Sequence, residues 1–431
     1  MPRLNLSVLV GAALISLICY RAQEHNSSLR MFQRAYSEIA DHYVEPQDET
    51  ELIEAAIRGM VGQLDENSHF DSPERSRELH SELHQQFYGI GIEVEFNSVT
   101  QKVLVVSPVV GSPAYEAGVI AGDCILEIDG KPTKGIPFDK IVNLIRGDKG
   151  VAVELQIERT GEDKPLKFSI VRAMIRENSV LGDIRDSSGK WNFTLEQHPE
   201  IAYARVTKFG ERTVEELQTA LHDLKKQSRI KALIIDLRGN GGGFLDTAVA
   251  MCNMFFKEGD IVSLRGRDKT KPRAYRADGS AEFTDFPMVV LVNRGSASAS
   301  EIVAACLQDH KRAVICGERS YGKGTVQNVI PLEGDHSLKL TTSRYFRPSG
   351  KNIHRMKEAK ETDEWGVLPE PDLEVKLKDQ DIVKLMKARR NRDLHRDAAT
   401  PDSDDEPETT PFSDEALQKA VDYLTTKMKS P

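Results

Sequence analysis

Residues 288–309 read MVVLVNRGSASASEIVAACLQD. The stretch Met288–Asn293 is short and almost entirely apolar, as expected of a strand that is buried on both faces. Beyond a turn of small residues, apolar side chains recur at helical spacing between Ser298 and Asp309. A buried strand that leads directly into a helix is the repeating unit of α/β folds with a mostly parallel sheet.

The same alternation extends on both sides of this stretch. It predicts an α/β core over residues 173–390. The expected order is strand Ile201–Val206, helix Thr213–Gln227, strand Ala232–Leu237, helix Asp246–Phe256, the stretch above, and strand Ala313–Cys316.

Other periodicities predict the rest of the organisation. Apolar residues at helical spacing favour an N-terminal helical region over residues 23–85. Strand-like alternation with one helix, Pro137–Arg146, indicates a compact domain over residues 86–172. Residues 391–412 are rich in Asp, Glu, Pro, Ser and Thr, which predicts an acidic disordered linker. Residues 413–431 predict a C-terminal helix.

The first 22 residues have the pattern of a targeting segment. Arg3 precedes a largely apolar run, Val8–Tyr20, that is too short to span a bilayer core comfortably. A secretory signal peptide fits this pattern best, although an uncleaved membrane anchor and a buried helix stay open. The sequence therefore predicts an extracytoplasmic protein, periplasmic or in the cell envelope, whose only contact with the membrane is this segment.

Composition excludes several classes of function. The net charge of −9 argues against a nucleic-acid-binding protein, which normally carries a basic face. Five widely spaced cysteines and eleven scattered histidines give neither a disulfide framework nor a zinc signature. His80 and His84 have the spacing of helical metal ligands, but no third ligand is apparent, so a solvated helix face is the better interpretation. No metal and no cofactor are expected.

Ser298 lies where the strand gives way to the helix. A hydroxyl at that edge of a parallel sheet is well placed to act as a nucleophile. The N–H of Ala299 begins the helix and could stabilise an oxyanion. The same residues also form a capping box, Ser298-x-x-Glu301, which is a common purely structural way to start a helix.

Two glycine-containing loops follow other strands. Asp236-Leu237-Arg238-Gly239-Asn240-Gly241-Gly242-Gly243 lets the backbone approach a substrate, and its amides could supply a second oxyanion donor. Gly317-Glu318-Arg319-Ser320-Tyr321-Gly322-Lys323 imitates a phosphate-binding loop. However, Gly324 replaces the Ser or Thr that would bind Mg²⁺, and a strand replaces the required helix. A buried Lys323 could instead act as a base for a serine, with Gln327 orienting its amine.

Together, these segments resemble the carboxy-terminal processing proteases, also called tail-specific proteases, over most of residues 30–375. The resemblance implies a crotonase- or ClpP-like α/β protease core. The spacing of 25 residues between Ser298 and Lys323 is that of the family. It makes Ser298, and neither Ser296 nor Ser300, the nucleophile.

The resemblance also implies roles for other residues. Lys323 becomes the general base, Gln327 its orienting partner, and Gly241 or Gly242 an oxyanion donor. Asp309 matches an acidic position that is sometimes grouped with the active site, although its place at the far end of the helix favours a structural role. Glu370 stands where the family usually has Asp, after Gly366-Val367-Leu368-Pro369.

Residues 86–172 resemble a PDZ domain, an inserted module that binds C-termini. Tyr88-Gly89-Ile90-Gly91-Ile92 is similar to its carboxylate-binding loop, and Ile128-Asp129-Gly130 to part of its middle. A peptide would add as a strand beside Ile92–Phe96 and lie against the predicted helix. A small β-sandwich that only packs the other domains together is the alternative.

The resulting prediction is a serine endopeptidase that recognises the C-terminal tails of its substrates. Its partners would be proteins or peptides with accessible C-termini, and an adaptor protein or a second copy of the chain is possible. A catalytically silent, membrane-anchored PDZ scaffold is the main alternative. An acyl-CoA enzyme of the related crotonase architecture is a third, disfavoured by the export signal because acyl-CoA is cytosolic.

Overall fold

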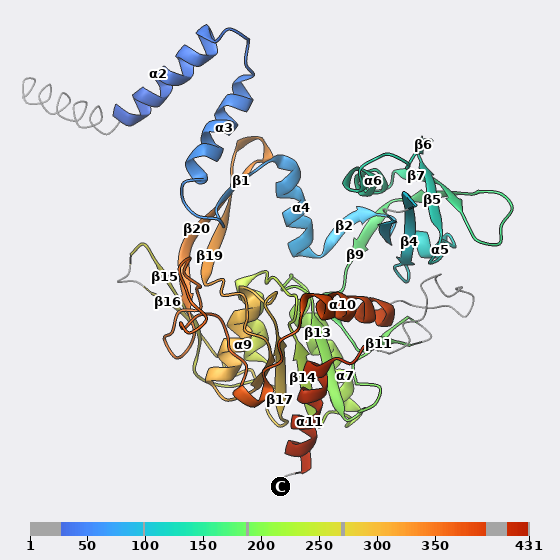
Figure 1. Ribbon diagram of the computed structural model, residues 1–431, viewed down its shortest axis with the longest axis vertical. Helices are drawn as coiled ribbons and strands as arrows, with labels where there is room; N and C mark the ends of the chain where they lie inside the picture. Colours follow the sequence, from blue (N-terminus) through green and yellow to red (C-terminus); the bar gives the residue numbers. More distant parts are fainter. Residues whose placement is uncertain (1–26, 98–99, 187–188, 269–271, 394–411, 430–431) are drawn as a thin grey trace, which may run out of the picture. The chain divides into compact units, whose positions relative to one another are not determined.

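The computed structural model describes residues 27–97, 100–186, 189–268, 272–393 and 412–429 (Figure 1). The chain divides into two compact units: Met1–Pro73 with Gln327–Thr341, and Glu74–Val326 with Thr342–Pro431. The predicted targeting segment, residues 1–22, lies outside the described residues, as does most of the predicted linker. Within the described ranges, no helix is both long and apolar enough to span a membrane.

The larger unit is built on the predicted parallel sheet. Its strands run in the order β10-β13-β14-β17-β18, and only the short edge strand β10 is antiparallel to its neighbour. The α/β prediction is thereby confirmed. The strands are β10 (Val180–Leu181), β13 (Ile201–Val206), β14 (Ala232–Asp236), β17 (Met288–Val292) and β18 (Val314–Gly317).

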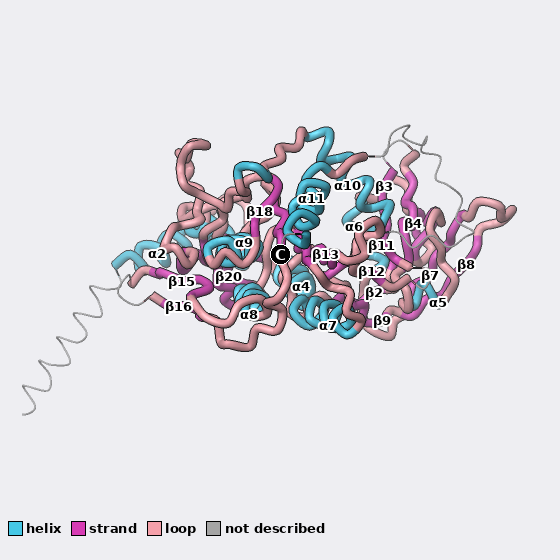
Figure 2. The backbone as a smooth tube through the Cα atoms, turned by 90° about the horizontal axis from the view of Figure 1, so that it is seen from below, coloured by secondary structure: helices cyan, strands magenta, loops and turns pink. Residues whose placement is uncertain are grey.

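This sheet is covered on both faces, which explains why its strands are apolar throughout. Along β14, Leu233 and Ile235 face the helices α7 (Thr213–Lys226), α8 (Leu245–Asn253) and α9 (Ala299–Asp309). The alternating residues of the strand face the C-terminal helix α11 (Glu415–Lys429). Figure 2 shows α11 and α7 on opposite sides of β13.

The sequence did not predict helix α10 (Asp379–Asp393), and the linker expected from residue 391 begins at least three residues later. The end of the helix is held by contacts that are remote in sequence. The Asp393 carboxylate pairs with Arg205, and its carbonyl accepts a hydrogen bond from Arg185 Nε at 2.9 Å. These contacts keep the last turn helical.

A second sheet in the larger unit contains β3 (Ile92–Asn97), β4 (Lys102–Pro108), β5 (Cys124–Ile128), β7 (Ala152–Glu158) and β8 (Leu166–Val171), in that order. Its core includes Ile141 and Ile145 of helix α6 (Phe138–Ile145). The short strands β2 (Gln86–Gly89) and β9 (Ala173–Arg176) pair at the two ends of this segment. Strand β3 lies at the edge of the sheet.

The larger unit also contains antiparallel strands outside these two sheets. Strand β15 (Asp260–Gly266) pairs with β16 (Arg273–Arg276) and with the last residues of β20 (Ser337–Phe346).

The smaller unit contains helices α2 (Ser27–His42) and α3 (Glu49–Val61), and strand β1 (His69–Asp71) paired with the first residues of β20. Strand β19 (Thr325–Pro331) also pairs with β20. Within this unit, α2 buries none of its residues.

The packing of α11 against the sheet predicts that truncating a buried side chain of this helix lowers the stability of the fold. Leu424 is fully buried there, so Leu424→Ala should lower the free energy of unfolding by about 2–5 kcal/mol, through lost burial and the cavity left behind. The exposed Lys427→Ala on the same helix should change it by less than about 0.5 kcal/mol. Urea unfolding measures both, and equal midpoints for the two variants would contradict the packing of α11.

Candidate active site

Ser298 immediately precedes helix α9 and has an unusual backbone conformation. Its φ is +56° and its ψ is −115°, a region that a residue with a side chain enters at a cost of about 1–3 kcal/mol. Such strain is concentrated at functional sites. Ser298 is half-buried, whereas Ser296 and Ser300 are fully buried. Of the three serines, Ser298 is therefore the one that a substrate can reach.

The two neighbouring serines fasten the glycine loop, residues 238–243, to the serine loop, residues 293–300. Ser296 Oγ donates to the carbonyl of Leu237, the residue just before the glycine loop, and Ser300 Oγ donates to the Asn240 carbonyl within it, each at 2.8 Å. The Ala297 N–H donates to the same Asn240 carbonyl at 3.0 Å. The hydroxyls that were set aside as nucleophiles thus hold the two loops in register.

Within the glycine loop, Gly242 lies directly against Ser298. A Cβ on Gly242 would come within 2.8 Å of the Ser298 Cβ, so only glycine fits without displacement. Its N–H donates to Asn240 Oδ1 at 2.8 Å. A Cβ on Gly241 would meet no other heavy atom within 4 Å. The Ala299 N–H, in the first turn of α9, is not used by the helix's own ladder.

Glu301 joins the serine loop to the lysine loop, residues 317–323. Its buried carboxylate accepts four hydrogen bonds. Oε2 accepts from the backbone N–H groups of Ser298 at 2.9 Å and Lys323 at 2.8 Å. Oε1 accepts from Ser320 Oγ at 2.6 Å and from the Gly322 N–H at 2.7 Å. Because Ser298 and Lys323 share one acceptor atom, their backbones are fixed side by side.

The electrostatics of Glu301 follow from this burial. Removal from water raises the pKa of the Glu301 carboxyl to about 7, and the four donors act in the opposite direction by favouring the charged form. The capping box predicted from the sequence is present, since the Ser298 N–H donates to Glu301. The contacts of the same carboxylate with the lysine loop were not predicted.

Tyr345 of strand β20 also contacts this region. Its hydroxyl donates to the Lys323 carbonyl. Burial and the nearby Glu301 raise the pKa of Tyr345 well above its ordinary value, while a hydrogen bond with the Ser298 side chain lowers it. The phenol therefore stays protonated and remains a donor at neutral pH.

Two other predicted site residues have identified partners of their own. Asp309, at the end of α9, pairs with Arg347 and accepts the Ser349 N–H at 3.0 Å, which is a structural role for that helix end. Gln327 belongs to the smaller unit, where its Nε2 donates to Thr341 Oγ1 at 3.1 Å.

The predicted carboxylate-binding loop has an ordered geometry. Ile90 is fully buried, and its carbonyl accepts the Ala114 N–H at 2.9 Å. The Gly91 carbonyl accepts the Val109 N–H at 2.8 Å and Ser112 Oγ at 3.0 Å. In a planar trans peptide, the N–H points opposite to the carbonyl, so the N–H groups of Gly91 and Ile92 point away from these partners. Gly89 ends strand β2.

The histidine pair does not form part of a metal cluster in the described residues, where no group of three or more His, Cys, Asp or Glu side chains converges. The rings of His80 and His84 lie 4.0 Å apart, centroid to centroid. His84 Nδ1 contacts Glu211 at 2.8 Å.

Sequence reasoning missed Ser320 and Tyr345 and gave Glu301 only a capping role. Ser320 lies in the lysine loop, three residues before Lys323, and forms no recognisable motif with it. Tyr345 lies in a strand that was not predicted.

The buried Glu301 predicts a dependence of stability on pH. Its pKa is about 7 in the folded chain and 4.5 ordinarily, so the folded state keeps a proton that the unfolded state releases between these values. This contribution is complete below pH 4.5 and is lost as the pH rises through 7. The wild type should lose up to about 3 kcal/mol of unfolding free energy relative to Glu301→Gln across this window.

Urea unfolding of both proteins at several pH values measures that difference. A difference between wild type and Glu301→Gln that is constant from pH 4.5 to 8 would show that Glu301 does not titrate in this window.

Comparisons with known proteins match three parts of the chain. Residues 200–369 match peptidase family S41, residues 104–159 match a PDZ domain, and residues 18–68 match the N-terminal domain of the activating protease CtpB. Among solved structures, a photosystem II D1 C-terminal processing protease is 29% identical, with a TM-score of 0.43, over 81% of this chain and 93% of that one.

Two curated relatives are similar to this chain over most of its length. A carboxy-terminal-processing protease of Bartonella bacilliformis is 38% identical over 80% of this chain and 78% of its own length. The carboxy-terminal processing protease CtpA of Bacillus subtilis is 33% identical over 78% of this chain and 68% of its own length. The family resemblance seen in the sequence is confirmed: the chain belongs to peptidase family S41 and is a multi-domain serine-type peptidase with a PDZ domain.

Proposed function

We propose that the chain is an endopeptidase in which Ser298 is the nucleophile and Lys323 the general base, and that its PDZ domain selects substrates by their C-terminal tails. The observation that carries the catalytic part is the shared acceptor Glu301 Oε2, which holds the N–H groups of both residues. A Ser–Lys pair acts only if the two residues are held together, and this carboxylate does so from outside the reacting groups.

The reaction is an acyl transfer in two steps. Ser298 Oγ attacks the scissile carbonyl while its proton passes to the neutral amine of Lys323, and the resulting ammonium then protonates the leaving amine. Water hydrolyses the acyl-enzyme by the same proton route. The developing oxyanion accepts hydrogen bonds from the Ala299 N–H and from an N–H of Gly241 or Gly242.

Tail recognition follows from the edge strand of the PDZ domain. Strand β3 lies at the edge of its sheet in the part of the chain that the structure describes, and an extended peptide can add antiparallel to such a strand. Alternate peptide side chains would then face α6, where Phe96 and Phe138 have ring centroids 6.4 Å apart. The outward N–H groups of Gly91 and Ile92 suit a terminal carboxylate.

Family membership favours a peptidase over the two alternatives, a silent scaffold and an acyl-CoA enzyme. The N-terminal sequence pattern supports an extracytoplasmic location, with substrates that are proteins or peptides with accessible C-termini.

Hydrolysis of an unstructured protein tests the catalytic proposal. With the chain from residue 23 onward and β-casein as substrate, Ser298→Ala and Lys323→Ala should each lower the rate by at least about a thousandfold. Lys323→Ala keeps the backbone N–H that binds Glu301, so its effect isolates the amine. The exposed Lys376→Ala is the matched control and should retain full activity. Turnover by Ser298→Ala near the wild-type rate would refute the proposal.

Peptide binding tests tail recognition. In the Ser298→Ala chain, a fluorescent decapeptide with an apolar last residue should bind at least about tenfold more tightly with a free C-terminal carboxylate than as the C-terminal amide. The amide loses the charge that the loop N–H groups attract. Fluorescence anisotropy measures both affinities, and equal affinities would argue that the domain does not recognise C-termini.

A further inference from the structure

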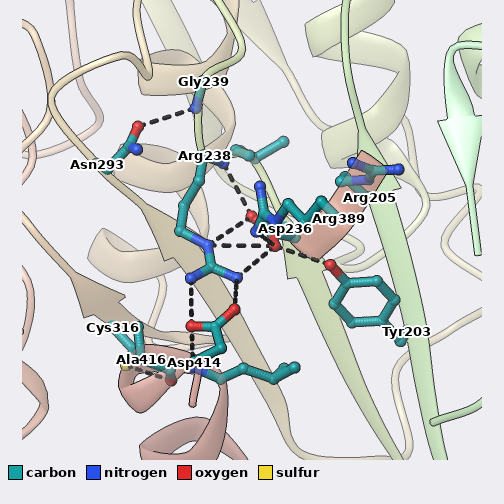
Figure 3. Close-up of polar contacts among 12 residues, drawn as sticks. Tyr203, Arg205, Asp236, Arg238, Gly239, Asn293, Cys316, Arg389, Asp414 and Ala416 are labelled. Carbon is teal, nitrogen blue, oxygen red and sulfur yellow. Dashed lines mark hydrogen bonds and ion pairs between the residues drawn. The ribbon is translucent and has the colours of Figure 1, made fainter. Parts of the chain in front are cut away.

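The glycine loop begins with a buried arginine between two carboxylates (Figure 3). The Arg238 side chain is 1% exposed, and the residue lies two positions beyond the end of strand β14. It binds Asp236 through Nε at 3.0 Å and Nη2 at 2.7 Å. It binds Asp414 through Nη1 at 2.7 Å and Nη2 at 2.8 Å. All three guanidinium nitrogens are therefore engaged.

The charges of this group are closely balanced. Asp236 also accepts from the Tyr203 hydroxyl at 2.9 Å and pairs with Arg389 of helix α10. The nearby guanidinium groups hold the pKa of both carboxyls, Asp236 and Asp414, below their ordinary range, so both are charged at neutral pH. A buried guanidinium without one of its carboxylates would be poorly compensated.

Asp414 brings the C-terminal helix into this group. Its Oδ1 accepts the Leu417 N–H at 3.1 Å, so the carboxylate that binds Arg238 also caps helix α11. Behind the cap, Ala416, Ala420 and Leu424 are buried against the sheet. The C-terminal helix is thus fixed to the sheet by its apolar face and to the glycine loop by one carboxylate.

The loop that Arg238 anchors reaches the nucleophile within four residues. The Gly239 N–H donates to Asn293 Oδ1 at 2.9 Å, and Asn240 Nδ2 donates to the Val206 carbonyl at 2.8 Å. Gly242 then lies against Ser298. Four of the six residues from 238 to 243 are glycines, which resist displacement weakly because they have no side chains to pack. Arg238 and Asn240 therefore position the loop through their side chains, together with the contacts from the serine loop.

We propose that Asp414 is a positioning residue for catalysis: by pairing with Arg238, the C-terminal helix holds the glycine loop at the distance from Ser298 that oxyanion stabilisation requires. This inference rests on the proposed function. The loop acts mainly on the transition state, so loosening it lowers kcat and leaves KM nearly unchanged.

The substitution Asp414→Asn separates the ion pair from the helix cap. Asparagine caps helices about as well as aspartate, so α11 should stay folded while Arg238 loses a charged partner. In the chain from residue 23 onward, with a short unstructured peptide substrate, kcat should fall by about 10- to 100-fold and KM should change less than about twofold. Asp414→Glu keeps the charge and should lose several-fold less activity than Asp414→Asn.

Two control variants on the same helix separate positioning from stability. Leu424→Ala loosens the packing of α11 and leaves the ion pair in place, so it should lower the melting temperature with a kcat close to that of the wild type at a temperature where it is folded. Asp422→Asn removes an exposed carboxylate and should change neither quantity.

The outcomes decide between the possibilities. A folded Asp414→Asn chain with a kcat within twofold of wild type would overturn the inference. The inference would also be overturned if kcat fell in both Asp414→Asn and Leu424→Ala in proportion to the fall in their melting temperatures. If Asp414→Asn does not fold, Asp414→Ser takes its place, since serine also caps helices and lacks the charge. A fall in kcat of about tenfold or more then supports the inference, and a kcat within twofold of the wild type contradicts it. Turnover by Ser298→Ala in this assay would instead refute the proposed function itself.

Discussion

One carboxylate oxygen, Glu301 Oε2, determines the geometry of the site. It accepts the N–H groups of Ser298 and Lys323, two residues in loops that follow different strands. The Glu301 side chain is buried, and its four hydrogen bonds favour the charged form while removal from water raises its pKa to about 7. Since Glu301 lies one turn into α9, the position of the helix sets the position of both loops.

The remaining architecture brings three loops to this point. They follow β14, β17 and β18, three neighbouring parallel strands, so all three leave the same edge of the sheet. Serine hydroxyls fasten the glycine loop to the serine loop, Glu301 fastens the serine loop to the lysine loop, and Arg238 ties the first of them to the C-terminal helix. The loops of the proposed reacting residues are thus held by neighbours that take no part in the proposed chemistry.

The sequence was informative where function depends on local pattern. Strand and helix periodicity predicted the parallel core, and the family resemblance paired Ser298 with Lys323, whose loops the structure brings together. It was uninformative where a contact joins distant segments: Asp414 lies 176 residues from Arg238, and Tyr345 lies 22 residues from Lys323 on an unpredicted strand. The capping motif at Glu301 was visible, but its second set of partners has no signature in local spacing.

The most direct test of the central claim is the acylation of Ser298 by an activated ester, followed by intact-protein mass spectrometry and peptide mapping. If Glu301 holds a reactive Ser–Lys pair, the wild type should form one acyl adduct that maps to Ser298, and Glu301→Gln, although folded, should form it at least about tenfold more slowly. An adduct on another residue, or equal rates in the wild type and the Glu301→Gln chain, would contradict the account.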